Sequence, residues 1–390
     1  MIPYGRQEIT TEDIDSVVEV LKSNFITQGP KVPEFENLIK SYCGVKYAVA
    51  VNSSTSALHI ACLALDLGPG DWLWTTPITF VASANCARYC GAQVDFVDID
   101  PLTANMSPDA LREKLVIAKI YNKLPKIVIP VHLAGQSCDM RAIYGLSQEF
   151  GFQIIEDASH AIGGRYENEP IGICQYSAIT VFSFHPVKII TTGEGGMAVT
   201  NSAKLASKMQ LLRSHGITRD KDLMSSQMEK PSWYYEQQIL GFNYRLTDIQ
   251  AALGISQLNR LDKYISKRAE IAGVYSKAFS ELPVGLPFTH KNYYSAWHLY
   301  VIRINGEQNR RNQIFESLKA SNIHTNLHYI PVHLQPYYKQ LGESVGYNQD
   351  SFPESLRYYQ EAITLPIYPK LLNSEQELII NIVKNELDRG

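Results

Sequence analysis

Short apolar runs rich in β-branched residues recur through the first 200 residues, and amphipathic stretches separate them. Stretches such as 55–67 and 140–150 place their apolar residues at helical spacing. Strands that alternate with helices predict an α/β fold whose mostly parallel sheet is covered on both faces. Seven runs have the length and composition of its strands: 47–52, 73–76, 94–99, 126–133, 153–157, 178–184 and 196–201.

The pattern changes after residue 216. Residues 217–238 show no periodicity and predict a long irregular loop. Thr247, with Gln250 three residues later, has the spacing of a capping box at the start of a long helix. The apolar stripe expected along this helix consists of Ile249, Leu253, Leu258, Leu261 and Ile265.

We expect this helix to lead from a large domain into a smaller α+β domain. The large domain is predicted at residues 1–255 and the C-terminal domain at residues 256–390. The segments assigned to the second domain are 297–304, 312–322, 324–330 and a C-terminal helix from about residue 374.

Composition excludes several classes of function. A net charge of −3 leaves no basic footprint for nucleic acid. No apolar run approaches the length of a membrane span, and the first residues lack the pattern of a signal peptide, so we expect neither membrane insertion nor secretion. None of the six cysteines forms a Cys-x-x-Cys pair or a zinc-finger spacing, which predicts no metal site and a cytoplasmic protein.

Polar residues follow several of the predicted strands, where α/β sheets bind ligands. Ser54, Thr55 and Ser56 begin a helix after the strand at 47–52, and the backbone N–H groups there suit a phosphate. Simple helix capping is the alternative for these residues. Asp157 directly follows another strand and His160 comes three residues later. A carboxylate at Asp157 could stabilise a positive ring nitrogen of a ligand, although an ordinary strand-end acid would look the same.

Lys188 follows the apolar strand at 178–184, which contains Ser183. A desolvated lysine loses part of its preference for the charged form, so its neutral amine becomes a nucleophile for an aldehyde. A solvated surface lysine is the alternative for any single lysine. Asn243 and Arg245 precede a helix cap and could reach a phosphate or a carboxylate.

Phe80 could stack on a planar ring, although a core phenylalanine is the alternative. Each of these features is weak when taken alone. Together they supply a phosphate cradle, an acid for a ring nitrogen, an aromatic lid and a nucleophilic lysine. Pyridoxal 5′-phosphate (PLP) requires this set of partners.

In order along almost the whole chain, these stretches resemble the DegT/StrS family of sugar aminotransferases, which belong to the fold-type I class of PLP enzymes. The resemblance rests on "FITQGPKVPEFE" (25–36), "NSSTSALHIA" (52–61), "TTPITFVASAN" (75–85), "EDASHAIGG" (156–164), "FSFHPVKIITTGEGG" (182–196), "GFNYRLTDIQAALG" (241–254), "LHYIPVHLQPYY" (327–338) and "LPIYP" (365–369). It implies a large domain with a mostly parallel seven-stranded sheet and a small C-terminal α+β domain.

The resemblance also implies residue roles. Lys188 would bond covalently to the cofactor aldehyde and then act as general base and acid. Asp157 would pair with the pyridine nitrogen, His160 would lie near the cofactor hydroxyl, and Phe80 would stack on the ring. The phosphate would be held by Ser54, Thr55 and Ser183, and Asn243 would reach the site of the neighbouring subunit in a homodimer.

The implied sugar-nucleotide contacts come from three parts of the chain. They are Tyr4, then Asn24, Phe25, Ile26 and Thr27, and finally His328, Tyr329, Ile330 and Pro331. "HPVKIITT" and "HYIPVHLQPYY" are most similar to the subgroup of pseudaminic acid biosynthesis. The implied reaction moves an amino group from L-glutamate to C4 of a UDP-linked 4-keto-6-deoxy-N-acetylhexosamine, giving UDP-4-amino-4,6-dideoxy-N-acetyl-β-L-altrosamine.

Other functions remain open at this point. The enzyme could act on another nucleotide-linked 4-ketosugar, of the perosamine, viosamine or bacillosamine type. A sugar 3-dehydratase of the same fold carries histidine at the position of Lys188, which disfavours that reaction. A catalytically silent regulatory protein should lack one of Lys188, Asp157 or the phosphate cradle, and this chain keeps all three. No G-x-G-x-x-G follows a predicted strand, which disfavours a dinucleotide-binding enzyme.

The sequence departs from the family pattern at two places. Ser54-Thr55 replaces the more common Gly-Thr or Ala-Thr pair, and its amides should still cradle a phosphate. Gly193 stands where close relatives often have alanine, which should change loop flexibility more than chemistry.

Overall fold

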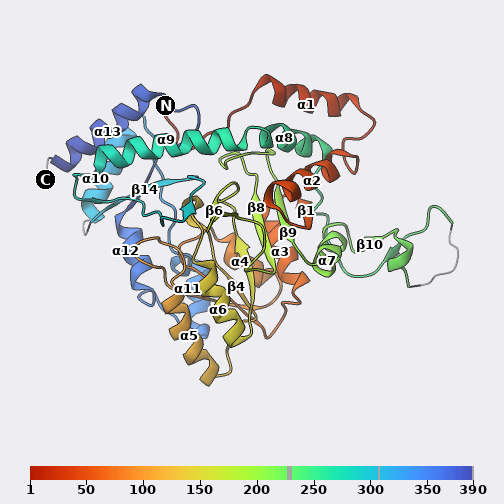
Figure 1. Cartoon of the computed structure of the whole chain (residues 1–390). Coiled ribbons are helices and arrows are strands. Elements are labelled where there is room, and N and C mark those ends of the chain that lie inside the picture. The colour runs from red at the N-terminus through yellow and green to blue at the C-terminus, as the bar shows by residue number, and fades with distance from the viewer. Residues whose placement is uncertain (226–230, 306–307, 389–390) are drawn as a thin grey trace.

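A seven-stranded sheet forms the centre of the molecule in the computed structural model (Figure 1), which describes residues 1–225, 231–305 and 308–388. Its strands run in the spatial order β1-β9-β8-β5-β4-β2-β3. Each of the seven strands predicted from the sequence is present in it. The strands are β1 (Tyr47–Val51), β2 (Trp72–Thr75), β3 (Gln93–Phe96), β4 (Ile127–Ile129), β5 (Gln153–Asp157), β8 (Ile179–Ser183) and β9 (Gly196–Thr200).

Strand β9 is the one member of this sheet that runs against its neighbours, since it pairs antiparallel with both β1 and β8 while the other pairs are parallel. The chain reverses between β8 and β9 through Gly193, whose φ of +83° lies in the left-handed region that favours glycine. The glycine-rich stretch 193–196 thus lies where the chain doubles back into β9. The fold class is α/β, as predicted.

Helices cover both faces of the sheet and bury its alternating apolar residues. One face packs on α3 (Ser54–Ala64), α4 (Ala82–Tyr89) and α7 (Ala203–Arg213). The other face packs on α2 (Lys31–Cys43), α8 (Asp248–Leu258), α5 (Pro108–Ile120) and α6 (Met140–Phe150). Burial on both faces explains why the strands read as nearly continuous apolar runs.

The single long helix expected after Thr247 is instead two helices, α8 and α9 (Leu261–Phe279). The capping box at Thr247 and Gln250 is present as predicted. Arg260 has non-helical backbone angles at the junction, where its guanidinium pairs with Asp13 of α1 (Thr11–Lys22). The predicted stripe is divided accordingly: Leu261 and Ile265 of α9 are buried, whereas Ile249, Leu253 and Leu258 of α8 are half-buried.

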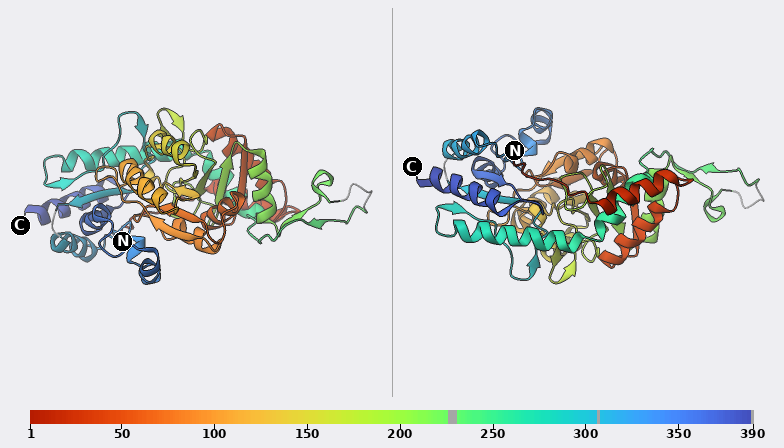
Figure 2. Two further views of the ribbon diagram at one scale, coloured as in Figure 1. Left: turned by 90° about the horizontal axis from the view of Figure 1, so that it is seen from below. Right: turned by 90° about the horizontal axis from the view of Figure 1, so that it is seen from above.

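The segment predicted as an irregular loop at 217–238 begins and ends in short paired strands, so that prediction was wrong at its ends. β10 (Ile217–Thr218) pairs antiparallel with β11 (Glu236–Gln237), and a 3-10 turn, η2 (Lys221–Leu223), follows β10. Residues 226–230 lie outside the described residues. In Figures 1 and 2 this arm extends away from the body of the molecule.

A second core forms around a three-stranded antiparallel sheet of β12 (Val284–Gly285), β14 (Tyr300–Ile304) and β15 (Ala362–Leu365). It packs against α9, α10 (Gln308–Ala320) and α13 (Asn373–Asp388), and α12 (Pro353–Glu361) contacts β14 and α10. Tyr338 of α11 (Pro336–Val345) instead packs into the core of the large sheet. Ile2 also belongs to this core, because its backbone bonds to Asn322 and His324. The domain boundary at residue 255 stays a prediction.

Three further short strands, β6 (Arg165–Tyr166), β7 (Glu169–Pro170) and β13 (Tyr293–Tyr294), make a small separate sheet. Two 3-10 turns, η1 (Leu133–Gly135) and η3 (Val332–Leu334), complete the regular elements of the described ranges. Within those ranges no helix has the length and apolar content needed to cross a membrane. Nor do three or more His, Cys, Asp or Glu side chains gather there in a metal-binding cluster.

Gly196 lets the backbone before α3 lie directly on the start of β9. A Cβ atom at Gly196 would stand 2.5 Å from the backbone of Ser53 and Ser54. Gly196→Ala should therefore lower the free energy of unfolding by about 1–3 kcal/mol, as overpacking does elsewhere. Chemical denaturation measures the change.

Gly145 provides the matched control, because it lies in α6 with open space around its Cβ position. Gly145→Ala should stabilise the protein by about 0.5–1 kcal/mol through helix propensity. Equal effects of the two substitutions would contradict the close approach at Gly196.

Candidate active site

The polar residues singled out in the sequence come together around the ends of β5 and β8. Ser183, the last residue of β8, stands opposite Gly196 in the sheet, and so does Val51, the last residue of β1. Because the backbone of Ser53 and Ser54 at the start of α3 packs against Gly196, the start of this helix also lies next to Ser183. The helix N-terminus and the Ser183 side chain thus share one corner of the site.

Ser53 is the N-cap of α3, and its hydroxyl accepts a hydrogen bond from the Ser56 amide at 3.1 Å. The Ser56 hydroxyl donates to Asn52 Oδ1 at 2.6 Å, so Ser56 belongs to the cap and is buried. Ser54 and Thr55 are half-buried in the first turn, where amide groups have no intrahelical acceptor. These two residues, rather than Ser56, offer N–H groups to an anion.

Asp157 ends β5 with its carboxylate buried. Ser83 of α4 donates a 2.6 Å hydrogen bond to Oδ2, and the amide of Ser159 donates to Oδ1 at 3.1 Å. The Ser83 hydroxyl also lies 2.8 Å from that of Thr79. A carboxylate fixed from two sides has a defined direction in which to meet a further partner.

Lys188 lies close to Asp157 and to a buried histidine that follows β13. Its Nζ is 3.4 Å from Nε2 of His298. Burial lowers the pKa of Lys188 to about 8, and the nearby Asp157 carboxylate raises it by a smaller amount. The side chain of Lys188 is half-buried rather than exposed, so the solvated-surface alternative does not describe it.

His160 contacts both ends of the site. Its Nδ1 accepts a hydrogen bond from the amide of Ala134 at 3.3 Å, and its Nε2 is 3.1 Å from the hydroxyl of Tyr329. Burial, reinforced by the charge of Lys188, lowers the pKa of His160 well below its ordinary value. A neutral ring that accepts at Nδ1 carries its proton on Nε2 and donates it to Tyr329.

The predicted substrate stretches are only partly assembled around this cluster. Tyr4 packs on His328, with ring centroids 5.1 Å apart, and His328 Nδ1 is 2.8 Å from the Thr364 hydroxyl. Tyr329 lies between His160 and Phe80, whose ring centroid is 6.2 Å away. Ile330 is exposed and Pro331 is buried.

Other predicted site residues lie apart from Lys188 and face solvent. Asn243 and the stretch 24–27 are exposed, and no hydrogen bond or ring contact among the described residues joins them to Lys188, Asp157 or His160. Phe80 is 59% exposed, so it is neither a core residue nor covered by another part of this chain.

Reasoning from the sequence missed two residues of this cluster, His298 and Ser83. His298 lies in a stretch that was assigned only to the second domain, 110 residues beyond Lys188. Ser83 lies in "TTPITFVASAN", in which Phe80 alone was singled out. A buried histidine and a helix-start serine give no local signal for contacts this distant in sequence.

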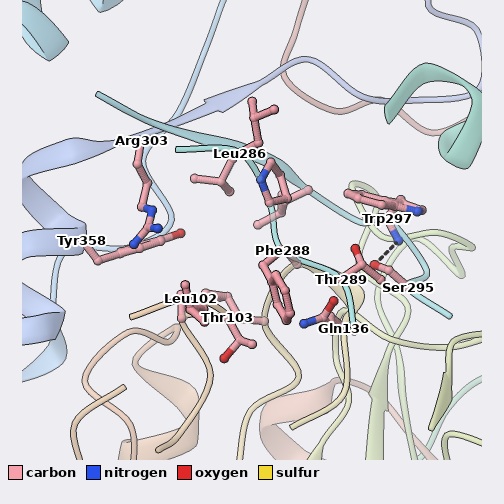
Figure 3. A pocket seen from close by; sticks show the side chains of 16 residues that line it. Leu102, Thr103, Gln136, Leu286, Phe288, Thr289, Ser295, Trp297, Arg303 and Tyr358 are labelled. Carbon is pink, nitrogen blue, oxygen red and sulfur yellow. Dashed lines mark hydrogen bonds between the residues drawn. The ribbon is translucent and has the colours of Figure 1, made fainter. Parts of the chain in front are cut away.

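A cavity of about 50 Å³ lies beside the segment that carries His298 (Figure 3). Trp297, the neighbour of His298, lines it together with Ser295, Gln136 and Phe288. Lys188, Asp157 and His160 are not among its lining residues. The cavity is therefore a feature next to the cluster rather than the cluster itself.

Residues 7–384 match the model of the DegT/DnrJ/EryC1/StrS aminotransferase family. The chain belongs to this family. It is therefore a PLP-dependent aminotransferase, which confirms the predicted family, cofactor, enzyme class and fold type.

Named relatives cover nearly the whole chain. The chain is 40% identical to the spore coat polysaccharide biosynthesis protein SpsC of Bacillus subtilis, over 98% of this chain and 96% of that protein. It is 38% identical to a UDP-4-amino-4,6-dideoxy-N-acetyl-beta-L-altrosamine transaminase of Campylobacter jejuni, over 95% and 93%. It is therefore similar both to a spore coat polysaccharide biosynthesis protein and to a sugar-nucleotide transaminase.

Solved structures agree with this assignment over their full length. Helicobacter pylori PseC, an aminotransferase involved in the biosynthesis of pseudoaminic acid, superposes with a TM-score of 0.89 at 32% identity, covering 100% of both chains. The putative sugar aminotransferase Spr1654 of Streptococcus pneumoniae, in its PMP form, superposes with a TM-score of 0.90 at 30% identity, also covering 100% of both.

The lowered pKa of Lys188 predicts a pH-dependent cost to stability in the cofactor-free protein. Its folded pKa of about 8 lies below the ordinary value of 10.5. The charged amine therefore destabilises the folded state below about pH 8, and this cost disappears as the pH rises from 8 to 10.5. Lys188→Met should raise the unfolding midpoint at pH 7, by an amount that shrinks towards pH 10.

Lys277→Met is the control, because Lys277 is exposed on α9 and its replacement should change stability by less than about 0.5 kcal/mol at any pH. Denaturation midpoints across this pH range measure both variants. A Lys188→Met midpoint below that of the unchanged protein at pH 7 would contradict a buried amine.

Proposed function

We propose that this aminotransferase moves an amino group from L-glutamate to C4 of a UDP-linked 4-keto-6-deoxy-N-acetylhexosamine, giving UDP-4-amino-4,6-dideoxy-N-acetyl-β-L-altrosamine. The Campylobacter relative carries that name, and the PseC neighbour belongs to pseudaminic acid biosynthesis. The observation that carries the catalytic part of the proposal is the amine of the half-buried Lys188, which lies 3.4 Å from Nε2 of His298 and close to the Asp157 carboxylate. The B. subtilis relative is named for spore coat polysaccharide biosynthesis rather than for the altrosamine reaction, so a different nucleotide-linked 4-ketosugar is the second candidate.

The residues at the strand ends fit PLP. When it is bound, PLP supplies an aldehyde for an amine and a ring that accepts electrons. The half-buried amides of Ser54 and Thr55, with the Ser183 hydroxyl, would hold its phosphate. Asp157 would keep the ring nitrogen protonated, and Ser83 would hold Asp157 in place.

One imidazole and one aromatic ring complete the proposed set of cofactor contacts. His160 would lie near the cofactor hydroxyl, as the family resemblance implies. Its ring is neutral, and its Nδ1 accepts a hydrogen bond from the Ala134 amide. Phe80 would lie against the ring, and its exposed face leaves it available for stacking. Because Tyr329 accepts from His160, its own hydroxyl proton is free to meet the substrate.

Lys188 is the general base and acid in the proposed reaction. With a pKa of about 8, roughly a tenth of its amine is neutral at pH 7, far more than at the ordinary value of 10.5. A neutral amine accepts a proton from the substrate carbon and returns it at the adjacent position. Burial thus creates the base, and the charge of Asp157 moderates the effect.

We propose a homodimer with shared active sites. Asn243 faces solvent in a single chain, and so do Phe25 and Ile26, which are 55% and 52% exposed. The β10–β11 arm extends from the body (Figure 2). A partner subunit would cover these surfaces, and Asn243 of each subunit would reach the active site of the other. We place the dimer in the cytoplasm, where the six free, buried cysteines stay reduced.

Lys188→Ala should lower transamination by at least about a hundredfold, because it removes both the nucleophile and the base. The assay offers L-glutamate with a panel of UDP- and dTDP-linked 4-ketosugars and follows 2-oxoglutarate. Lys277→Ala on the exposed face of α9 is the control and should keep full activity. Normal turnover by Lys188→Ala would sink the catalytic assignment.

The panel also separates the two candidate substrates. Preference for the UDP-linked N-acetylated ketosugar is expected, and the coupling constants in the product's NMR spectrum give the stereochemistry at C4. Preference for a dTDP-linked sugar without the acetamido group would contradict the first candidate and favour the second.

Mixing two inactive variants tests the shared site. Lys188→Ala and Asn243→Ala subunits, unfolded and refolded together in equal amounts, should regain about a quarter of the sites, because half of the dimers are mixed and each has one intact site. Activity measured after mixing gives the result. No recovery, with dimers present by light scattering, would mean that each subunit completes its own site.

A further inference from the structure

His298 is a buried histidine in contact with the amine proposed to react. Its side chain is 3% exposed, and its Nε2 lies 3.4 Å from Lys188 Nζ. Its ring packs against that of His160, with centroids 4.4 Å apart. Neither the cofactor contacts nor the substrate contacts proposed above include it.

The backbone around His298 is held by a buried arginine. Arg268 of α9 is 1% exposed, and its guanidinium donates to the carbonyl oxygens of Trp297, His298 and Ile367 at 3.3, 3.3 and 2.9 Å. Three carbonyl groups are the acceptors of this cation in the described contacts. Because a buried guanidinium needs these acceptors, its hydrogen bonds hold the backbone at residues 297 and 298 against α9.

A close backbone approach holds the same segment from the other side. The amide of Ala296 donates to the carbonyl of Gly135 at 2.9 Å, and that of Leu299 donates to Ala134 at 3.3 Å. A Cβ atom at Gly135 would stand 2.8 Å from the Trp297 nitrogen and 3.1 Å from the His298 nitrogen. The imidazole of His298 is therefore mounted on a segment fixed between α9 and the turn after β4.

The direction of the Lys188–His298 hydrogen bond follows from charge. Burial lowers the pKa of His298 well below its ordinary value, and the charge of Lys188 lowers it further, so the ring is neutral. An ammonium group can only donate, so Nε2 of His298 must accept from Nζ and the ring proton lies on Nδ1. Nδ1 has no hydrogen-bond partner among the described residues.

We propose that His298 is a positioning residue for Lys188, and that its Nε2 accepts a hydrogen bond from Nζ and holds the amine in the site whenever Lys188 is not bonded to the cofactor. The inference rests on the proposed role of Lys188. It adds a residue from the segment between β13 and β14, held in place by Arg268, to the binding of the free amine between the two halves of the reaction.

A matched pair of substitutions tests this role. His298→Gln keeps an acceptor near the position of Nε2, whereas His298→Met has a similar length and a side chain that accepts only weakly. In the enzyme loaded with pyridoxamine 5′-phosphate, the pH dependence of Lys188 acetylation by acetic anhydride, followed by peptide mass spectrometry, gives the pKa of the free amine.

Loss of the acceptor removes a hydrogen bond to the charged form. His298→Met should therefore lower the measured pKa of Lys188 by about one unit, and His298→Gln should leave it near that of the unchanged enzyme. The rate at which 2-oxoglutarate restores the absorbance of the aldehyde form should fall about tenfold in His298→Met and recover in His298→Gln.

His333→Gln is the control for loss of a buried imidazole, because His333 lies among Phe96 and Phe352 and its Nδ1 also has no partner within the described ranges. It should leave the pKa of Lys188 unchanged. An unchanged pKa in His298→Met, or a Gln variant as impaired as the Met variant at equal thermal stability, overturns the inference.

Trapping of the cofactor with borohydride separates this inference from the proposed function. If the reduced cofactor is found on a lysine other than Lys188, the proposed function fails and this inference fails with it. If it is found on Lys188 while His298→Met behaves like the unchanged enzyme, only the positioning role is lost.

Discussion

The site depends on one positive charge that is poorly solvated. The amine of Lys188 lies among His160, His298 and His328, and all three rings have lowered pKa values, that of His328 about 3. Burial is the first cause for each ring, and the charge of Lys188 adds to it. Because the three rings are neutral, Lys188 is the group of this cluster that carries a positive charge, and the nearby Asp157 carboxylate favours that charge. A base of moderate strength results from this balance.

The sheet determines where that charge is placed. The ends of β5 and β8 carry Asp157 and Ser183, and the antiparallel β9 begins at Gly196 beside them. The missing side chain at Gly196 allows the α3 N-terminus to approach, which puts this helix end beside Ser183. The proposed phosphate cradle and the proposed reacting amine both follow strand ends of this one sheet.

The central sheet could be predicted from the sequence because its strands are buried on both faces and read as β-branched runs, as in 178–184. Asp157 and Lys188 were identified as candidates because the first stands at the end of such a run and the second four residues after one. The break between α8 and α9 was not found, since it depends on Arg260 meeting Asp13 of a distant helix. His298 was missed for the same reason, because its contact with Lys188 joins residues that are 110 positions apart in the sequence.

The proposed chemistry requires that Lys188 be the residue that bonds PLP. Its most direct test is to load the purified enzyme with PLP, reduce it with borohydride and locate the added cofactor mass by peptide mass spectrometry. We expect Lys188 to be the one modified residue, and the visible absorption band to disappear on reduction. A modified lysine elsewhere, or a protein that binds PLP without any reducible bond, would contradict it.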